Sequence, residues 1–173
     1  GGWDSFNVTE DADLGVRLKR LRYRCGAFSS RTYEEAPIGL GPWMRQRTRW
    51  MKGWMQTFIV HNSRPRAFLR DIGWRNFLIF QAYVGGMILS APLHTVFATV
   101  FLGRMALGFG PGFSLADPWS MAQLIILITG YGASFVIAAL GLWRLGLRRL
   151  LWWQVLLPIY WFLTSWAALR ALY

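Results

Sequence analysis

The stretch PWMRQRTRWMKGWMQTFIV, residues 42–60, predicts a helix with two chemically different faces. Pro42 follows Gly39 and Gly41 and suits the first helical position, where its missing N–H costs nothing. At the helical period, large apolar residues fall on one broad arc, and basic or polar residues fall opposite. The arc comprises Trp43, Met44, Trp50, Met51, Trp54, Met55 and Phe58, and the opposite face comprises Arg45, Thr48, Arg49, Lys52 and Gln56. A basic face beneath a Trp- and Met-rich one is typical of a helix that lies at a membrane surface.

A third stripe lies between these two faces. Its members, at i, i+3, i+4 and i+7, are Gln46, Arg49, Trp50 and Gly53, which we call the polar flank. An amide, a guanidinium and an indole thus converge beside a residue without a side chain, and membrane anchoring does not need that arrangement. Arg47 projects from the middle of the apolar arc, so we expect it to snorkel or to find an anionic partner.

The composition of the 173 residues points towards a membrane protein. Hydrophobic residues make up 54% and aromatic residues 17%, with eleven Trp, which is too apolar for an ordinary soluble domain. The net charge of +11 is uneven: residues 1–75 hold 14 Lys/Arg and 7 Asp/Glu, whereas residues 76–173 hold 5 Arg and 1 Asp. A basic first part suggests docking on anionic lipid or phosphate-bearing substrates. The apolar runs argue against nucleic acid as the partner, and the single Cys25 excludes an internal disulfide framework and a Cys-based metal site.

Three apolar runs in the second part are long enough to span a bilayer. We expect transmembrane helices at about residues 77–102, 121–143 and 151–172. Before them, residues 66–75 predict a second short surface segment with four side chains that dip into the membrane: Phe68, Leu69, Ile72 and Trp74. We expect His61, in the break that precedes this segment, to be solvated or interfacial.

Near the start of the chain, a helix is predicted to begin at Thr9. Thr9 can serve as the N-cap, and the acids that follow, Glu10, Asp11 and Asp13, put negative charge at the positive end of the helix dipole. Leucines at positions 14, 18 and 21 recur as a narrow buried stripe, and Gly26 suits the end of the helix. Residues 27–33 then predict a short strand, followed by a turn at residues 34–37.

Thr9-Glu10-Asp11, which we call the T-E-D motif, allows two interpretations. It can be the start of a well-capped surface helix. Alternatively, Asp11 lies in a cleft at a strand–helix junction and accepts a proton, because a carboxylate at a helix N-terminus stays ionised easily and can act as a general base. These three residues alone do not decide between the two.

The T-E-D motif is followed, after one predicted helix and one strand, by QRTRW at residues 46–50. This pair of motifs resembles the C-terminal half of the catalytic site in processive-type family 2 glycosyltransferases. These are the cellulose, hyaluronan and related β-glycan synthases, whose motifs are T-E-D and Q-x-x-R-W. Both motifs match without substitution, and the interfacial helix and apolar runs are similar to the architecture of the family. The resemblance covers the first 60 residues closely and the remainder in architecture only.

The resemblance implies an inverting single displacement, in which an acceptor hydroxyl attacks the anomeric carbon of a nucleotide-activated sugar and expels the nucleoside diphosphate. Asp11 would be the catalytic general base. The residues that would contact substrate are Thr9, Glu10, Gln46, Arg49 and Trp50. Among them, Arg49 suits charge-assisted contact with the diphosphate, and Trp50 offers a flat face to a sugar ring.

The same family needs upstream acidic residues, including a D-x-D pair for a divalent cation, Mg²⁺ or Mn²⁺, beside the leaving diphosphate. No D-x-D precedes the T-E-D motif, and we interpret the match of Asp11-Ala12-Asp13 to this sequence pattern as a coincidence. The sequence also opens without an initiator Met or a signal peptide. We therefore interpret it as the C-terminal part of a longer protein and expect no metal ligands within it.

The expected fold has three parts. Residues 1–41 would be the end of a Rossmann-like α/β catalytic domain of the glycosyltransferase A type, residues 42–75 an interfacial helix region, and residues 76–173 an α-helical transmembrane region. The implied function is that of a membrane-bound hexosyltransferase, with a nucleotide-sugar donor (a UDP-sugar, or alternatively GDP-mannose) and a polysaccharide or glycolipid acceptor.

The lipid bilayer would be the remaining partner, with the protein in the inner (plasma) membrane and its catalytic part in the cytoplasm. The alternative is a non-catalytic membrane anchor or scaffold whose basic interfacial helix binds anionic lipid. That alternative accounts for the basic face, the Trp residues and the spans. It leaves the T-E-D motif and the polar flank unexplained.

Overall fold

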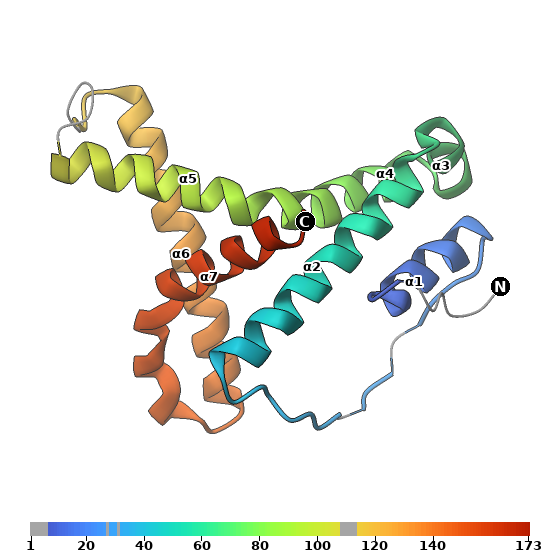
Figure 1. The fold of residues 1–173 in the computed structure, drawn as a ribbon, viewed down its shortest axis with the longest axis horizontal. Helices are drawn as coiled ribbons and strands as arrows, with labels where there is room; N and C mark the ends of the chain where they lie inside the picture. Colours follow the sequence, from blue (N-terminus) through green and yellow to red (C-terminus); the bar gives the residue numbers. More distant parts are fainter. Residues whose placement is uncertain (1–6, 27, 31, 108–113) are drawn as a thin grey trace. The chain divides into compact units, whose positions relative to one another are not determined.

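The computed structural model describes residues 7–26, 28–30, 32–107 and 114–173, and the regular structure within these ranges is helical. In chain order the elements are α1 (Glu10–Arg20), α2 (Leu40–Asn62), α3 (Pro65–Ile72), α4 (Trp74–Phe80), the π-helical segment η1 (Gln81–Gly85), α5 (Gly86–Leu107), α6 (Pro118–Arg144), the 3₁₀ segment η2 (Arg148–Leu156) and α7 (Leu157–Arg170) (Figure 1). The chain divides into two units. The first comprises residues 1–92 and 166–173, and the second comprises residues 93–165.

Helix α2 is the long helix that the sequence predicts, and it is the centre of the first unit. It begins at Leu40 after Gly39, so Pro42 stands within its first turn, where no intrahelical N–H bond is lost. The apolar arc supplies two of its buried residues, Met44 and Met51, and Met51 packs against small residues of α5 and the C-terminal segment: Ala91, Ala168 and Ala171. Part of the predicted membrane-facing arc is therefore covered by the protein itself.

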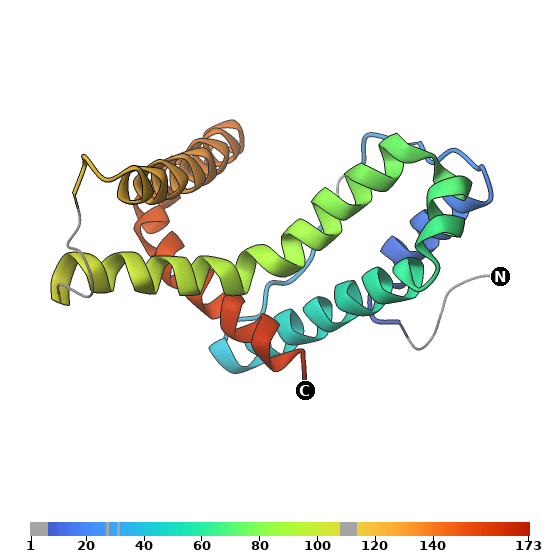
Figure 2. The ribbon, with the colours of Figure 1, turned by 90° about the horizontal axis from the view of Figure 1, so that it is seen from above.

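Helix α1 lies beside α2 and also contacts α3, as both ribbon views show (Figures 1 and 2). It ends at Arg20, earlier than the predicted stop at Gly26, and Arg22 adopts the left-handed conformation with φ 65°. The predicted leucine stripe therefore loses its last member, because Leu21 lies beyond the helix and is 69% exposed. The buried residue of α1 is instead a carboxylate, Asp13.

An aromatic cluster forms where α3, α4 and η1 pack beneath α2. Phe68 and Ile72 of α3 are buried against Phe80 and Val84, and the rings of Phe58 and Phe80 stack with centroids 5.9 Å apart. The expectation that residues 66–75 dip four side chains into the membrane is therefore wrong for Phe68 and Ile72, because these two pack inside the first unit.

The predicted strand at residues 27–33 does not form in the part of this segment that the structure describes. Residues 28–30 and 32–33 are irregular, and Phe28 and Tyr33 are 88% and 87% exposed. A strand needs a neighbouring strand to satisfy its N–H and C=O groups, and none of the described residues provides one. The Rossmann-like α/β fold is therefore not seen in residues 7–26, 28–30 and 32–41.

Within the part of the chain that the structure describes, two helices are long and apolar enough, by length and composition, to cross a membrane. They are Trp74–Ala106, with 33 residues and mean hydropathy 1.6, and Pro118–Arg144, with 27 residues and mean hydropathy 2.1. The predicted spans at residues 77–102 and 121–143 lie inside them. The third predicted span, residues 151–172, divides between η2 and the 14-residue helix α7. Its crossing of the membrane stays a prediction.

The second unit contains α6 and the part of α5 that follows Pro92. Asp117 caps α6 by accepting hydrogen bonds from the backbone N–H groups of Trp119 and Ser120, and Arg104 of α5 donates to Asp117 and to Ser120. Of the segment between these helices, the structure describes residues 114–117, and residues 108–113 are outside the described ranges.

Candidate functional site

The T-E-D motif and the polar flank meet where α1 begins against the middle of α2. Thr9 directly precedes the first turn of α1, and both Thr9 and Gly53 are buried. A Cβ atom added at Gly53 would stand 2.8 Å from Cγ2 of Thr9 and 2.9 Å from its backbone nitrogen. Gly53 therefore provides clearance, as the sequence predicts, but Thr9 fills that space.

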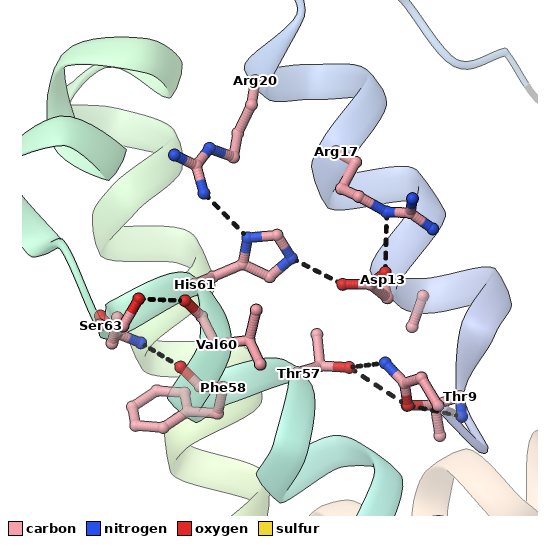
Figure 3. A network of polar contacts seen from close by, with 12 residues as sticks. Thr9, Asp13, Arg17, Arg20, Thr57, Phe58, Val60, His61 and Ser63 are labelled. Carbon is pink, nitrogen blue, oxygen red and sulfur yellow. Dashed lines mark hydrogen bonds and ion pairs between the residues drawn. The ribbon is translucent and has the colours of Figure 1, made fainter. Parts of the chain in front are cut away.

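One turn further along α2, Thr57 continues this contact. Its Oγ1 accepts a hydrogen bond from Nδ2 of Asn7 at 2.9 Å and lies 3.3 Å from Oγ1 of Thr9 (Figure 3). Asn7 in turn accepts hydrogen bonds at Oδ1 from the backbone N and from Oγ1 of Thr9, at 3.0 and 3.2 Å. The Thr9 hydroxyl is thus used between the two helices, and it does not cap α1 in the way that the sequence predicts.

A further turn along α2, His61 joins a network of charged side chains. Its Nε2 lies 2.9 Å from Oδ1 of Asp13, and its Nδ1 lies 3.3 Å from Nη1 of Arg20 (Figure 3). Arg20 also donates from Nε and Nη2 to Oδ2 of Asp71 on α3, at 3.1 and 2.9 Å. Arg17 pairs with Oδ2 of Asp13 at 2.8 Å. The network therefore connects α1 to α2 and to α3.

The chemistry of His61 follows from its burial. The side chain is 2% exposed, and its ring lies 5.5 Å from the ring of Phe68, so little water can solvate a positive charge. This desolvation lowers the pKa of His61, although the hydrogen bond with Asp13 opposes the shift. A neutral ring satisfies both contacts, since Nε2–H donates to Asp13 and Nδ1 accepts from Arg20. The expectation of a solvated or interfacial His61 is therefore wrong.

Asp11, the predicted general base, occupies the first turn of α1 and is exposed. Its Oδ1 accepts a hydrogen bond from the backbone N of Ala12 at 2.7 Å, and Glu10 beside it is half-buried. Successive helical residues are rotated by about 100°, so Asp11 and Asp13 project to nearly opposite sides of α1. With Asp13 turned into α2, Asp11 is left facing outward, where a hydroxyl of an acceptor can reach it.

Two members of the polar flank, Gln46 and Arg49, line an open groove of about 500 Å³. The remaining lining residues come from the start of α2 and from the irregular segment before it: Glu35, Pro37, Pro42 and Arg45. The guanidinium groups of Arg45 and Arg49, one helical turn apart, give the groove a basic wall. Such a wall suits an anionic ligand, because planar guanidinium groups match phosphate oxygens.

Trp50, the third polar side chain of the flank, does not line this groove. The guanidinium carbon of Arg47 lies 4.9 Å from the ring centroid of Trp50 and 5.5 Å from that of Trp43. Such distances are typical of cation–π contacts. Arg47 thus interacts with two rings of the apolar arc, which the sequence analysis does not foresee. One contact surface of Trp50 is consequently used inside the protein, while 37% of the residue remains exposed.

The described residues do not offer a site for a divalent cation. Across residues 7–26, 28–30, 32–107 and 114–173, no three His, Cys, Asp or Glu residues gather closely enough to hold a metal ion. In the D-x-D spelling at residues 11–13, Asp13 is buried against His61 and Arg17, and Asp11 faces the other side of α1. These two carboxylates therefore do not fit the metal-binding pair of the family.

The polar residues that hold α1 in place are not among the site residues predicted from sequence. These are Asn7, Asp13, Arg20, Thr57 and His61. A pattern was available, because Gly53, Thr57 and His61 follow one another at intervals of four residues along one side of α2. A glycine, a threonine and a histidine spaced in this way indicate close contact with a neighbouring polar helix.

Comparison with known proteins gives a consistent result. The whole chain, residues 1–173, matches the family described as glycosyl transferase family group 2. The protein named "Probable glycosyltransferase YdaM" from Bacillus subtilis (strain 168) is 41% identical over 54 residues, which are 31% of this chain and 13% of that protein. Beta-monoglucosyldiacylglycerol synthase from Synechocystis sp. is 26% identical over 87 residues, 47% of this chain and 18% of that protein.

The matched segments thus cover less than a fifth of either relative, and no solved structure matches the chain. Both relatives are named as enzymes that transfer or build sugars, and the family match extends from the first residue to the last. The chain belongs to glycosyl transferase family group 2.

Proposed function

We propose that this chain supplies the acceptor side and the membrane part of an inverting glycosyltransferase, which moves a sugar from a UDP-sugar to a glycan or glycolipid acceptor. The observation that carries the proposal is the contact between Thr9 and Gly53. It brings Thr9 of the T-E-D motif against Gly53, which follows the Q-x-x-R-W motif by three residues on the same helix. The two motifs lie more than thirty residues apart in sequence and are thus carried by helices that touch. A purely lipid-binding helix has no need of this contact.

Asp11 is the proposed general base. In the proposed step, one carboxylate oxygen of Asp11 accepts the proton of the acceptor hydroxyl as the hydroxyl oxygen forms its bond to the anomeric carbon of the donor sugar. The bond from that carbon to the nucleoside diphosphate breaks at the same time, and the diphosphate leaves with the electron pair. The exposed position of Asp11 on the first turn of α1 gives the acceptor access to the carboxylate.

The basic groove on α2 is proposed to hold the diphosphate end of the donor. Gln46 and Arg49 line it, and Arg45 adds a second guanidinium. Negative charge grows on the leaving diphosphate as the glycosidic bond breaks, so fixed guanidinium groups stabilise the transition state more than the ground state. Trp50, which follows Arg49 on α2 and is in contact with Arg47, is proposed to present its exposed ring surface to a sugar.

A membrane location suits a lipid-linked or membrane-translocated acceptor. The two long apolar helices, Trp74–Ala106 and Pro118–Arg144, support this location. The name of the Synechocystis relative specifies a glucosylated diacylglycerol, and on that basis a lipid hydroxyl is one proposed acceptor for this chain. A divalent cation, Mg²⁺ or Mn²⁺, is proposed to be held by other parts of the full-length enzyme.

The test uses membranes that contain the full-length protein. They are incubated with a panel of UDP-sugars and, separately, GDP-mannose, together with a total lipid extract from the host. Release of nucleoside diphosphate is measured, and the anomeric configuration of the product is determined by NMR. We expect release with at least one UDP-sugar and a β-linked product from the α-linked donor. No release of UDP above control membranes from any UDP-sugar, or a product with retained configuration, would refute the proposal.

A variant pair connects the activity to the groove. Arg49→Lys keeps the charge but loses the planar two-pronged donor, so we expect the donor KM to rise and kcat to fall. Arg66→Lys is the matched control, because Arg66 is an exposed arginine of α3 outside the groove. Equal effects of the two substitutions would remove Arg49 from the proposed site.

A further inference from the structure

The orientation of Asp11 depends on how α1 is seated. Helix α1 has 11 residues and has α2 on one side and α3 near its end. Its leucines at positions 14 and 18 are only half-buried, and the one residue that it buries is Asp13. Val16 of α1 packs against the aromatic cluster but is only half-buried, so apolar packing, which is non-directional, does not by itself fix the rotation of α1 about its axis. Directional polar contacts add to what sets that rotation.

Asp13 and His61 form a buried polar contact between α1 and α2. Their side chains are 7% and 2% exposed, and Oδ1 of Asp13 lies 2.9 Å from Nε2 of His61. A buried carboxylate without its partner would be costly, so α1 cannot rotate Asp13 away from His61 without a penalty. Because Asp11 and Asp13 project to nearly opposite sides of α1, the hydrogen bond between Asp13 and His61 also fixes the direction of Asp11.

Arg20 adds a second point of attachment, almost two turns along α1. It donates to Nδ1 of His61 at 3.3 Å and to Oδ2 of Asp71 at 2.9 Å. His61 therefore contacts α1 at two positions, with one ring nitrogen facing Asp13 and the other facing Arg20.

We propose that His61 is a positioning residue for glycosyl transfer: its neutral ring joins Asp13 to Arg20 and thereby holds α1 in the one rotation that points Asp11 towards the acceptor. His61 touches no substrate in this proposal, which rests on the proposed function of Asp11. Its contribution is to turnover, because the geometry of the base, and not the affinity for the donor, depends on it.

The surroundings of His61 make its contacts with Asp13 and Arg20 sensitive to acid. The groups that face it are Asp13, Arg17 and Arg20 from α1, Asp71 of α3 through Arg20, and the rings of Phe68 and Phe80. When His61 gains a proton, Nδ1 becomes a donor and faces the donating guanidinium of Arg20. That bond is then lost, and two positive charges face each other in a buried space. The attachment of α1 to α2 through His61 should therefore weaken in acid.

The experiment compares His61→Gln and His61→Phe in the full-length protein, in membranes. The donor is the one from the UDP-sugar panel that gives the fastest wild-type release of UDP. The Gln side chain can donate to Asp13 and accept from Arg20, but it does not titrate, whereas Phe fills the space without either hydrogen bond. Asn62→Ala is the matched control, because Asn62 is the next residue of α2 and its polar contacts lead to Phe58 and Gln81, not to α1.

We expect His61→Phe to lower kcat per folded molecule by roughly 10–100-fold with the donor KM little changed, as for a misplaced catalytic group. His61→Gln should keep most of the kcat at neutral pH. As the pH is lowered, its kcat should fall less than that of the wild type, because the glutamine does not titrate. Asn62→Ala should keep the wild-type kcat and the wild-type pH profile.

If the wild type releases no UDP, the proposed function fails. If it does, and both His61 variants show the wild-type kcat per folded molecule with an unchanged acid-side decline, the positioning role alone is refuted. An unchanged decline in His61→Gln contradicts the proposal even where His61→Phe fails to fold.

Discussion

The backbone nitrogen of Thr9 lies in the space that a side chain at position 53 would occupy: a Cβ at Gly53 would approach it to 2.9 Å. Real Cβ atoms do not come this close to backbone atoms, so α1 and α2 can adopt this contact only with glycine at position 53. The glycine thereby connects the T-E-D motif to the helix that carries the polar flank.

Gly53→Ala should therefore displace the start of α1 and reduce glycosyl transfer by roughly 100-fold, because an ångström-scale shift of a catalytic group is costly. The rate of transfer by the full-length protein in membranes measures the effect. Gly15→Ala is the control: nothing lies within 4 Å of a Cβ at this helical position, so alanine should be tolerated or slightly stabilising. Normal activity in Gly53→Ala would show that α1 is not seated as described.

The tryptophans of α2 distinguish a substrate-binding helix from a membrane anchor. If Trp50 presents its ring to a sugar, Trp50→Ala should reduce transfer at least about tenfold, and Trp50→Phe should be milder, as expected for the loss of an aromatic contact. Trp43→Ala and Trp54→Ala should have smaller effects on transfer. Activity normalised to membrane-bound protein is the measurement. Equal losses at all three positions, in proportion to lost membrane binding, would favour the anchor alternative.

The docking of α1 should weaken in acid even without substrate. Burial lowers the pKa of His61 below its ordinary value of 6.5. Between 6.5 and the lower folded-state pKa, the undocked form binds a proton that the docked form excludes, so docking is most stable above pH 6.5 and is lost progressively as the pH falls. Amide hydrogen exchange of residues 10–20 should accelerate at pH 5.5 relative to pH 7.5, after correction for intrinsic rates. The acceleration should be smaller in His61→Gln; an identical acceleration in both proteins would contradict this account.

Much of the helical structure is predictable from sequence, because it depends on local patterns. The 3.6-residue period identifies α2, the acidic first turn identifies α1, and continuous apolar runs identify the two long helices. The polar flank is also predictable, since residues three and four apart on a helix must share a side.

What sequence cannot supply is the pairing between distant elements. Gly53 indicates close approach, but nothing in the sequence says that Thr9 is the residue that approaches. The partners of His61 are equally hard to predict. In the sequence, His61 lies in an expected break between helices and suggests a solvated side chain, and only the packing of α1 and α3 places it between Asp13 and Arg20. The expected strand at residues 27–33 depends on partners that the sequence does not identify.

Topology gives a further prediction. A nucleotide sugar made in the cytoplasm requires residues 1–75 to face that side. The turn after α6 carries Arg144, Arg148 and Arg149 and should then be cytoplasmic by the positive-inside rule, with residue 114 outside. In a Cys25→Ser background, a cysteine at Ser114 should react with an impermeant thiol reagent in intact cells. A cysteine at Gly146 should react only after the membrane is opened.

Wild-type Cys25 is an internal control, because it is exposed on the protein surface and should be protected in intact cells. Labelling of Gly146→Cys in intact cells would show the opposite orientation, with the T-E-D motif on the side of the membrane where its donor is not made.

Asp11→Asn in the full-length enzyme shows whether Asp11 is the base of glycosyl transfer. The asparagine side chain keeps the size of the carboxylate but cannot take up the acceptor proton. At saturating donor the transfer rate should fall by roughly 10²–10⁴-fold, the usual contribution of general base catalysis, while the dissociation constant of the donor stays close to wild type. A transfer rate in Asp11→Asn near that of the wild type, at equal membrane levels, would contradict the account.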